Sequence, residues 1–202
     1  MATKQQHIDL VYQNLKRVAP GFKPERQLVE HSMGKAWSQI LHNAFRKDLS
    51  FLDFYVKDYK DQAVSQDADT NQYYVDLPVA IAQLPDKSEG VRAVLRGDAD
   101  YSTPAYTSTQ YVPVSDTTME QMDSLDCMNA ESGVVGYAVR YDKIMFDRKM
   151  TAILAAKKVH LKLVVPFDVY DATENIPVPS GQGENLVMMT IQFLMGSNQQ
   201  QQ

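Results

Sequence analysis

Apolar residues near the start of the chain recur at the spacing of an α-helix. In the segment HIDLVYQNLKRVA they lie three or four positions apart, from Ile8 to Val18. Pro20 and Gly21 follow at once, and this pair typically ends a helix. The pattern therefore predicts a first amphipathic helix.

A longer apolar stripe follows a Pro-Glu pair that is typical of a helix start. From Val29 to Phe45 the apolar residues occupy one broad face. They predict a long amphipathic helix over residues 25–48, about 36 Å long at 1.5 Å per residue. We expect residues 1–60 to form a helical region, in which residues 50–60 extend this helix or form a third, short one.

Strand signals fill the middle of the chain, after a polar loop expected at residues 61–72. The segments YYVDLPVAIAQLP, GVVGYAVRYDKIMFD and KVHLKLVVPFDVY are rich in Val, Tyr and Ile and are punctuated by Pro and Gly. Residues 141–143 are predicted to be a hairpin tip. We expect a mixed, mainly antiparallel β-rich domain over residues 73–182, with residues 117–132 as an inserted loop or short helix.

The last apolar segment, residues 183–196, fits two structures. Alternate residues are large and apolar, as in a strand: Val187, Met189, Ile191 and Phe193. Its length and few polar positions suit a buried helix equally, and an entry with Pro, Gly and Glu184 favours the helix. We predict a C-terminal apolar helix that its own domain or a neighbouring subunit covers on nearly all sides. With a disordered tail at residues 197–202, the whole chain is predicted to be an α+β protein.

Composition limits the classes of function. At 202 residues, the chain suits one domain, or one domain with a helical extension. A net charge of −5 argues against sequence-independent binding of nucleic acid, which needs clustered Lys and Arg. The single cysteine, Cys127, excludes an intrachain disulfide and a cysteine-rich zinc site. No segment resembles a signal peptide or approaches the ~20 apolar residues that span a bilayer, so we expect a cytoplasm-like compartment.

The loop SGQGEN, residues 180–185, is the stretch that looks most like a ligand-binding loop. A phosphate-binding P-loop needs a Lys and a Ser or Thr after its last glycine. Here Gly183 is followed by Glu184 and Asn185. A carboxylate at the entrance of a helix repels a phosphate, although it interacts favourably with the helix dipole. We therefore interpret the loop as a hinge into the last segment.

The other candidate sites are weaker. Asp67, Asp69 and Asn71 match the first ligands of an EF-hand loop, but the required glycine and the final glutamate are missing. The four histidines do not show metal-binding spacing. Cys127 lies in an acidic stretch, unlike an activated thiol. We therefore predict no catalytic, metal-binding or cofactor-binding residues, and a protein that is not an enzyme.

Two residue types point instead to packing or to interfaces. The chain has 11 tyrosines and 10 methionines. Tyr and Met are over-represented at protein–protein interfaces. An aromatic β core explains the tyrosines equally well, so both interpretations stay open.

In layout, the chain resembles small virion proteins of tailed bacteriophages. It is most similar to the head–tail connector (adaptor or ring) proteins of podoviruses and crAss-like phages. The resemblance covers most of the chain: the helical first third, YYVDLPVAIAQLP…GVRAV, the mixed β middle, KVHLKLVVPFDVYDATENIPVPSGQGENLV and the last apolar segment. In that family a polar stretch leads into [IL]P[IV]P and a terminal helix, which correspond here to residues 176–179 and 184–195. The final segment is shorter and less charged than such a helix usually is.

The resemblance implies a non-enzymatic virion protein without cofactors. It would form a homo-oligomeric ring, typically twelve-fold, and would contact the portal protein and tail or neck proteins. It would not contact membranes or bind nucleic acid specifically, although DNA would pass nearby, and it would be found in the virion and, during assembly, in the host cytoplasm. The two predicted helices, residues 25–48 and 184–195, would carry much of the intersubunit or portal packing, with these candidate interface residues: Trp37, Ile40, Phe45, Val187, Met189, Ile191 and Phe193.

Two alternatives remain. The first is another neck, tail-completion or capsid-associated virion protein. The second, from a different class, is a small intracellular α+β enzyme or ligand-binding protein with an unrecognised site.

Overall fold

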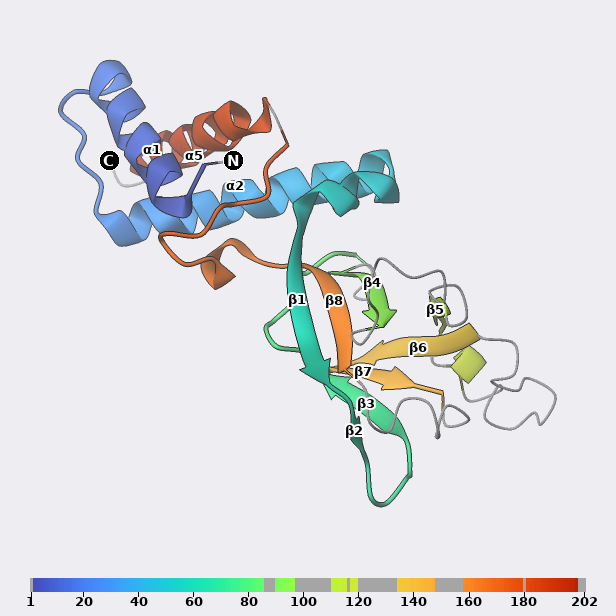
Figure 1. Cartoon of the computed structure of the whole chain (residues 1–202). Coiled ribbons are helices and arrows are strands. Elements are labelled where there is room, and N and C mark those ends of the chain that lie inside the picture. Colours follow the sequence, from blue (N-terminus) through green and yellow to red (C-terminus); the bar gives the residue numbers. More distant parts are fainter. Residues whose placement is uncertain are drawn as a thin grey trace. The chain divides into compact units, whose positions relative to one another are not determined.

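The structure is a computed structural model that describes residues 2–85, 90–96, 110–115, 117–119, 134–147, 158–179 and 181–199. The chain divides into two compact units (Figure 1). A helical unit contains Met1–Val56, Ala82–Pro85 and Val164–Gln202, and a β unit contains Lys57–Ile81 and Asp86–Leu163. The presence of helices together with mixed sheets confirms the predicted α+β class.

The first predicted helix is confirmed as α1 (Lys4–Val18), which begins at a capping box. The Thr3 hydroxyl oxygen accepts a hydrogen bond from the Gln6 backbone N–H at 3.2 Å, and the Gln6 side-chain oxygen accepts one from the Thr3 N–H at 2.9 Å. These two bonds satisfy backbone donors that a helix start leaves without partners. The buried apolar side of α1 follows the predicted spacing: Ile8, Val11 and Leu15.

The predicted long amphipathic helix is confirmed as α2 (Arg26–Lys47). The C-terminal segment is also helical, as α5 (Gln182–Gln199), which packs along α2 and contacts α1 (Figure 1). Helical spacing of its buried residues decides against a strand: Leu186, Val187, Thr190, Ile191 and Leu194. Within the chain, however, α5 is not covered on nearly all sides, because Met188 is 53% exposed and Phe193 is 38% exposed. Cover by its own domain is therefore incomplete, and cover by a neighbouring subunit stays a prediction.

The chain between the last strand and α5 is attached to the start of α1. The short 3₁₀ helix η6 (Phe167–Val169) begins this stretch. The backbone N–H groups of Lys4 and Gln5 donate to the carbonyls of Glu174 and Ala172, each at 2.9 Å. Ile176, the first residue of IPVP, is fully buried. The extended entry into α5 is therefore fixed by backbone hydrogen bonds to the N-terminus.

The described residues of the β unit form two sheets. The first has the strand order β1 (Val56–Ala63), β8 (Lys158–Val164), β4 (Val91–Arg96). The second has the order β2 (Ser65–Gln66), β3 (Tyr73–Asp76), β7 (Lys143–Phe146), β6 (Val134–Arg140), β5 (Gln110–Pro113). The β5–β6 pair is parallel, whereas β2–β3, β3–β7, β6–β7 and β4–β8 are antiparallel. The predicted mixed, mainly antiparallel arrangement is confirmed.

Two stretches already noted in the sequence, residues 141–143 and residues 67–71, form hairpin turns. Tyr141 has a φ of 54° and is 94% exposed between β6 and β7, which confirms the predicted hairpin tip. Between β2 and β3, the Asp67 carboxylate accepts hydrogen bonds from the backbone N–H groups of Asp69 and Thr70 at 3.0 and 2.9 Å. These bonds, foremost the one from Thr70, lower the pKa of Asp67. The acidic stretch that partly matches an EF-hand is thus the turn of a hairpin.

Several predicted boundaries need correction. The helical region does not extend to residue 60, because a 3₁₀ helix, η1 (Leu49–Tyr55), is followed directly by β1. The expected loop at residues 61–72 contains the end of β1 and all of β2. Residues 164–182 belong to the helical unit instead of the β-rich domain. Finally, α5 continues through residue 199, into the tail predicted to be disordered; residues 200–202 lie outside the described part of the chain.

Within the described residues, no helix combines the length and the hydropathy needed to cross a membrane.

Candidate interaction surface of the helical unit

Trp37 lies at the centre of the helical unit and is fully buried. Its indole N–H donates a hydrogen bond of 2.9 Å to the Val165 carbonyl. Its ring makes edge-to-face contacts with Tyr55 and Tyr170, with ring centroids 5.6 and 6.1 Å apart. The sequence predicts Trp37 at an interface, and the structure places it in the core instead.

Most of the other candidate interface residues are also covered by their own chain. Ile40, Val187 and Ile191 are buried. Phe45 and Met189 are half-buried, and Phe193 is exposed. The reason is that α5 packs along α2 and supplies the cover that the prediction assigns to a neighbouring subunit. Of the seven residues, only Phe193 presents a large part of its side chain to solvent.

A further group of exposed apolar residues, which the sequence does not predict, lies on η1. Leu49, Phe51 and Phe54 are 39%, 46% and 60% exposed. The rings of Phe51 and Phe54 are neighbours, with centroids 6.4 Å apart. We call these three residues the η1 patch. Grouped exposed apolar side chains of this size often mark an interaction site.

A cavity of about 380 Å³ lies beside the η1 patch, between the end of α2, η1 and the start of α5. Four apolar or aromatic side chains line it: Ile40, Ala44, Phe51 and Tyr55. Three amides and two cations complete the lining: Asn43, Gln182, Asn185, Arg46 and Lys47. Within the described part of the chain, no carboxylate lines it. We call this space the α2-end cavity; it suits an apolar group that carries negative charge at its edge.

A second hollow, a shallow groove of about 740 Å³, follows the solvent side of α2. Lys35 and Arg46 contribute exposed cations, and the rings of Phe167 and Phe193 lie along it. Lys4 also lines the groove, but its ammonium group donates to the Tyr170 carbonyl at 2.8 Å and lies 5.0 Å from the centre of the Phe167 ring. Lys4 therefore supports the fold of the groove wall.

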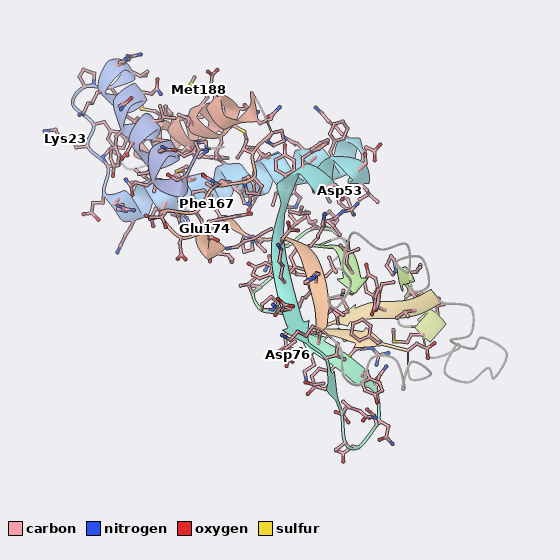
Figure 2. The ribbon with its side chains drawn as sticks, viewed as in Figure 1. Lys23, Asp53, Asp76, Phe167, Glu174 and Met188 are labelled. Carbon is pink, nitrogen blue, oxygen red and sulfur yellow. The ribbon has the colours of Figure 1, made fainter. Side chains whose placement is uncertain are left out.

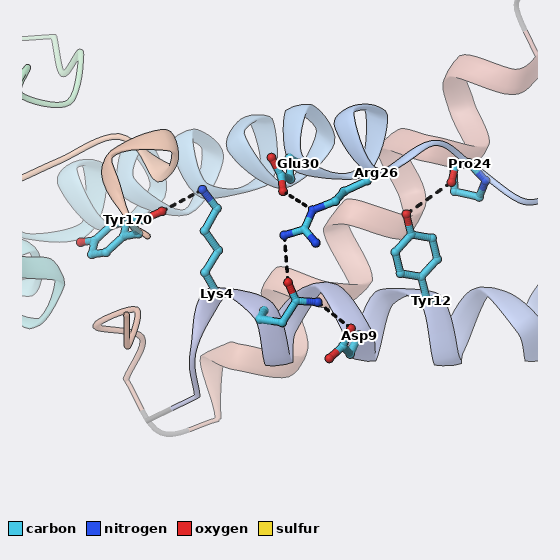
Figure 3. Close-up of polar contacts among 8 residues, drawn as sticks. Lys4, Asp9, Tyr12, Pro24, Arg26, Glu30 and Tyr170 are labelled. Carbon is cyan, nitrogen blue, oxygen red and sulfur yellow. Dashed lines mark hydrogen bonds and ion pairs between the residues drawn. The ribbon is translucent and has the colours of Figure 1, made fainter. Parts of the chain in front are cut away.

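Polar contacts join α1 to the first turns of α2 (Figure 3). The Arg26 guanidinium donates to the Glu30 carboxylate and to the Gln5 side-chain oxygen, both at 2.8 Å. The Gln5 amide in turn donates to the Asp9 carboxylate at 2.9 Å. These charges lie in the solvent-exposed contact between two helices, so we assign them a structural role.

His7 on α1 packs closely against the start of α5. Its side chain is 4% exposed, and its Nδ1 atom has no hydrogen-bond partner among the described residues. A methyl group added at Gly183 would lie 3.2 Å from the His7 Cε1 atom. Burial lowers the pKa of His7 because the charged imidazolium loses its hydration. The second glycine of SGQGEN thus lies where two helices approach each other closely, and a side chain there would crowd the His7 ring.

This burial predicts that acid destabilises the helical unit. Unfolded His7 takes up a proton near its ordinary pKa of about 6.5, whereas folded His7 does so only at lower pH. Neutral His7 therefore contributes fully to stability at pH values above the ordinary, unfolded pKa. This contribution is lost as the pH falls through the lowered folded pKa. We expect His7→Leu to reduce the loss of unfolding free energy between pH 7.5 and 5.0, as followed by Trp37 fluorescence.

The matched control for this experiment is His31→Gln, because His31 is exposed on α2. The control should keep the pH dependence of the wild-type protein. An unchanged pH dependence in His7→Leu would show that other groups cause the acid effect.

The remaining predicted motifs do not form a site. Among the residues that the structure describes, no group of three or more His, Cys, Asp or Glu side chains is placed to hold a metal ion. His160 accepts a hydrogen bond at Nδ1 from the Asp61 backbone N–H at 3.0 Å. Cys127 and most of residues 117–132 lie outside the described part of the chain.

Sequence reasoning missed both the η1 patch and the α2-end cavity. Composition gives a partial signal, since Phe51, Phe54 and Leu49 stand among charged and polar residues in KDLSFLDFY. The cavity itself combines residues from positions 40–55 and 182–185 and leaves no local pattern. A comparison with protein-family models and one with curated proteins both find no match to this chain.

Proposed function

We propose that this protein is a non-enzymatic virion subunit that forms a ring between the portal and the tail of a bacteriophage. The observation that carries the proposal is the η1 patch beside the α2-end cavity. A protein that works alone gains little from three large apolar side chains that are 39–60% exposed next to a hollow with an apolar floor and a basic, polar rim. A protein that works as an assembly buries such surfaces between its subunits.

Two further features support this proposal. The sequence resembles connector proteins over most of its length, including IPVP before a terminal helix. The net charge of −5 also suits a subunit near a DNA conduit, because an acidic surface repels the DNA backbone. If the assembled protein bound duplex DNA tightly at physiological salt, this part of the proposal would be wrong.

The experiment is a mass measurement of the purified protein across a range of concentrations, alone and with the portal protein. We expect a closed ring of many copies, or a ring that forms only on the portal. A protein that stays monomeric under both conditions and does not bind the portal would contradict the proposal. Assembly on a tail or capsid protein instead of the portal would favour another neck, tail-completion or capsid-associated role.

A second candidate function is that of a ligand-binding protein, which the groove along α2 favours. The groove is lined by two exposed cations, Lys35 and Arg46, and by two carboxylates, Glu30 and Asp168. The exposed ring of Phe193 also lines it, so the groove suits an elongated ligand that carries both charges. Thermal stabilisation of the monomer by such a ligand, weakened in Lys35→Glu, would favour this function over the assembly proposal.

A further inference from the structure

We propose that a second copy of this chain docks at the α2-end cavity through the exposed side of its α5 helix. Met188 of that copy enters the cavity, and its Glu184 lies at the basic rim. This inference rests on the proposed function, because a ring requires repeated contact between copies. It identifies which two surfaces make that contact.

The receiving surface has a defined chemistry. Its floor contains Ile40, Ala44 and Tyr55, each less than 10% exposed, and Phe51 forms a more exposed wall. Arg46 and Lys47 are exposed at the rim, next to the side-chain amides of Asn43 and Asn185. An entering group should therefore be large and apolar, and a carboxylate beside it should be attracted to the two cations.

The α5 helix carries a matching group on its exposed side. Met188 is 53% exposed, and Glu184 lies one turn earlier, also exposed (Met188 is labelled in Figure 2). Residues four apart lie on the same side of an α-helix, so the carboxylate and the thioether are neighbours. Methionine is unbranched and flexible, and it adapts well to irregular hollows. Acidic and apolar groups are thus paired in the way that the cavity requires.

The two surfaces lie on different sides of the same helix. Gln182 and Asn185 line the cavity, whereas the mean direction of Glu184 and Met188 lies roughly 110° away around α5 at 3.6 residues per turn, with Asn185 and Met188 themselves about 60° apart. One copy can therefore use both surfaces at once, receiving one neighbour and entering another. A contact between two different surfaces is head-to-tail, and this type of contact produces closed rings when the rotation between copies closes.

The contact is also adjacent to the η1 patch. Phe51 belongs both to the patch and to the cavity wall, and Phe54 lies beside it. A second copy seated in the cavity would cover these rings as well. The expected interface then includes two aromatic residues and one methionine, types that are enriched at interfaces.

The test uses charge reversal in the full chain. We expect Lys47→Glu to weaken self-association about tenfold or more, because it places a carboxylate opposite Glu184 of the neighbour. Glu184→Lys should do the same by placing two cations opposite each other. A mixture of the two variants should recover the assembly. In the mixture the altered cavity rim of one variant can meet the altered α5 side of the other, and the two unaltered surfaces can meet each other, so positions 47 and 184 carry opposite charges at every contact. Because Arg46 is unchanged and repels the introduced cation, recovery should stay below the wild-type level.

Lys23→Glu is the matched control. It makes the same change of charge in the exposed turn before α2, at the opposite end of that helix from the cavity. Its assembly should equal that of the wild-type protein. Trp37 fluorescence and far-UV circular dichroism confirm that each variant is folded before its mass is measured by light scattering.

The outcomes separate this inference from the proposed function. If the wild-type protein assembles and Lys47→Glu assembles equally well, the contact is assigned wrongly while the assembly proposal stands. If neither single variant assembles and their mixture does not assemble either, the pairing of these two surfaces is wrong. If the wild-type protein never assembles, alone or with the portal protein, the proposed function and this inference both fall.

Discussion

Replacing Trp37 with alanine is expected to destabilise the helical unit by about 3–5 kcal/mol, a large part of the stability of a typical domain. The ring is fully buried and contacts Tyr55 and Tyr170 edge-to-face. Alanine would leave a cavity among these rings and would also leave the Val165 carbonyl without the indole N–H that it accepts at 2.9 Å. The helical unit should then unfold at much lower denaturant concentration, as measured by circular dichroism at 222 nm.

Two further variants separate the causes of this effect. Trp37→Phe keeps most of the apolar volume and removes the indole N–H, so it should cost less, about 1–3 kcal/mol. Phe54→Ala removes an aromatic ring that is 60% exposed, and it should change the unfolding free energy of the monomer by less than about 0.5 kcal/mol. If Trp37→Ala unfolds at the same denaturant concentration as Phe54→Ala, Trp37 is not the centre of this core.

The elements with a strong local period could be predicted from the sequence. The apolar stripes of α1 and α2 span several turns each, and both helices form where the stripes predict them. The hairpin tip at Tyr141 and Asp142 could be found because turn residues separate the Val-rich run VVGYAV from the apolar run IMF. In these places local preference and the final packing agree, which is the condition under which sequence patterns are informative.

Elements that depend on distant partners could not be predicted. Residues 56–60 mix apolar and polar types in a way that also suits a helix. They nevertheless begin β1, which pairs with β8, a strand about a hundred positions later in the chain. Similarly, residues 172–176 pair with the backbone at residues 2–5, which draws the end of the chain back to the helical unit. Neither pairing leaves a local signal, because register between distant segments depends on tertiary packing.

The candidate interface residues show a related limit. Apolar character identifies residues that must be covered, but it does not say which surface covers them. The sequence-based prediction names Val187 and Ile191 as candidate interface residues and leaves open whether their own domain or a neighbouring subunit covers the segment. In the structure α2 covers them within the same chain, whereas Met188 on α5 and the η1 patch are among the apolar residues that stay exposed.

The loop SGQGEN gains a structural explanation for both of its glycines. Gly181 has a φ of +86°, in a region that residues with a side chain rarely adopt. Gly183 allows the start of α5 to approach His7. One glycine therefore turns the chain and the other permits close packing. The pattern of glycines that suggests a ligand loop follows from the way that α5 is attached to α1.

The second large effect is expected in α5, at two residues three positions apart. The same substitution, to aspartate, should unfold the helical unit at Ile191 but leave it folded at Met188. Ile191 is 5% exposed, so Ile191→Asp would place a carboxylate among apolar side chains without a partner. We expect it to destabilise the helical unit by more than about 4 kcal/mol and to detach α5 from α2. Loss of helical circular dichroism together with a shift of Trp37 fluorescence would measure this.

Met188→Asp makes the same chemical change on the exposed side of α5. Met188 is 53% exposed, so the monomer should lose less than about 1 kcal/mol, mainly through the lower helix propensity of aspartate. Assembly should nevertheless be lost, since a carboxylate would enter the apolar floor of the α2-end cavity. A folded, monomeric Met188→Asp beside an unfolded Ile191→Asp would divide α5 into a core side and an interface side. If Met188→Asp unfolds like Ile191→Asp, or assembles like the wild-type protein, that division is wrong.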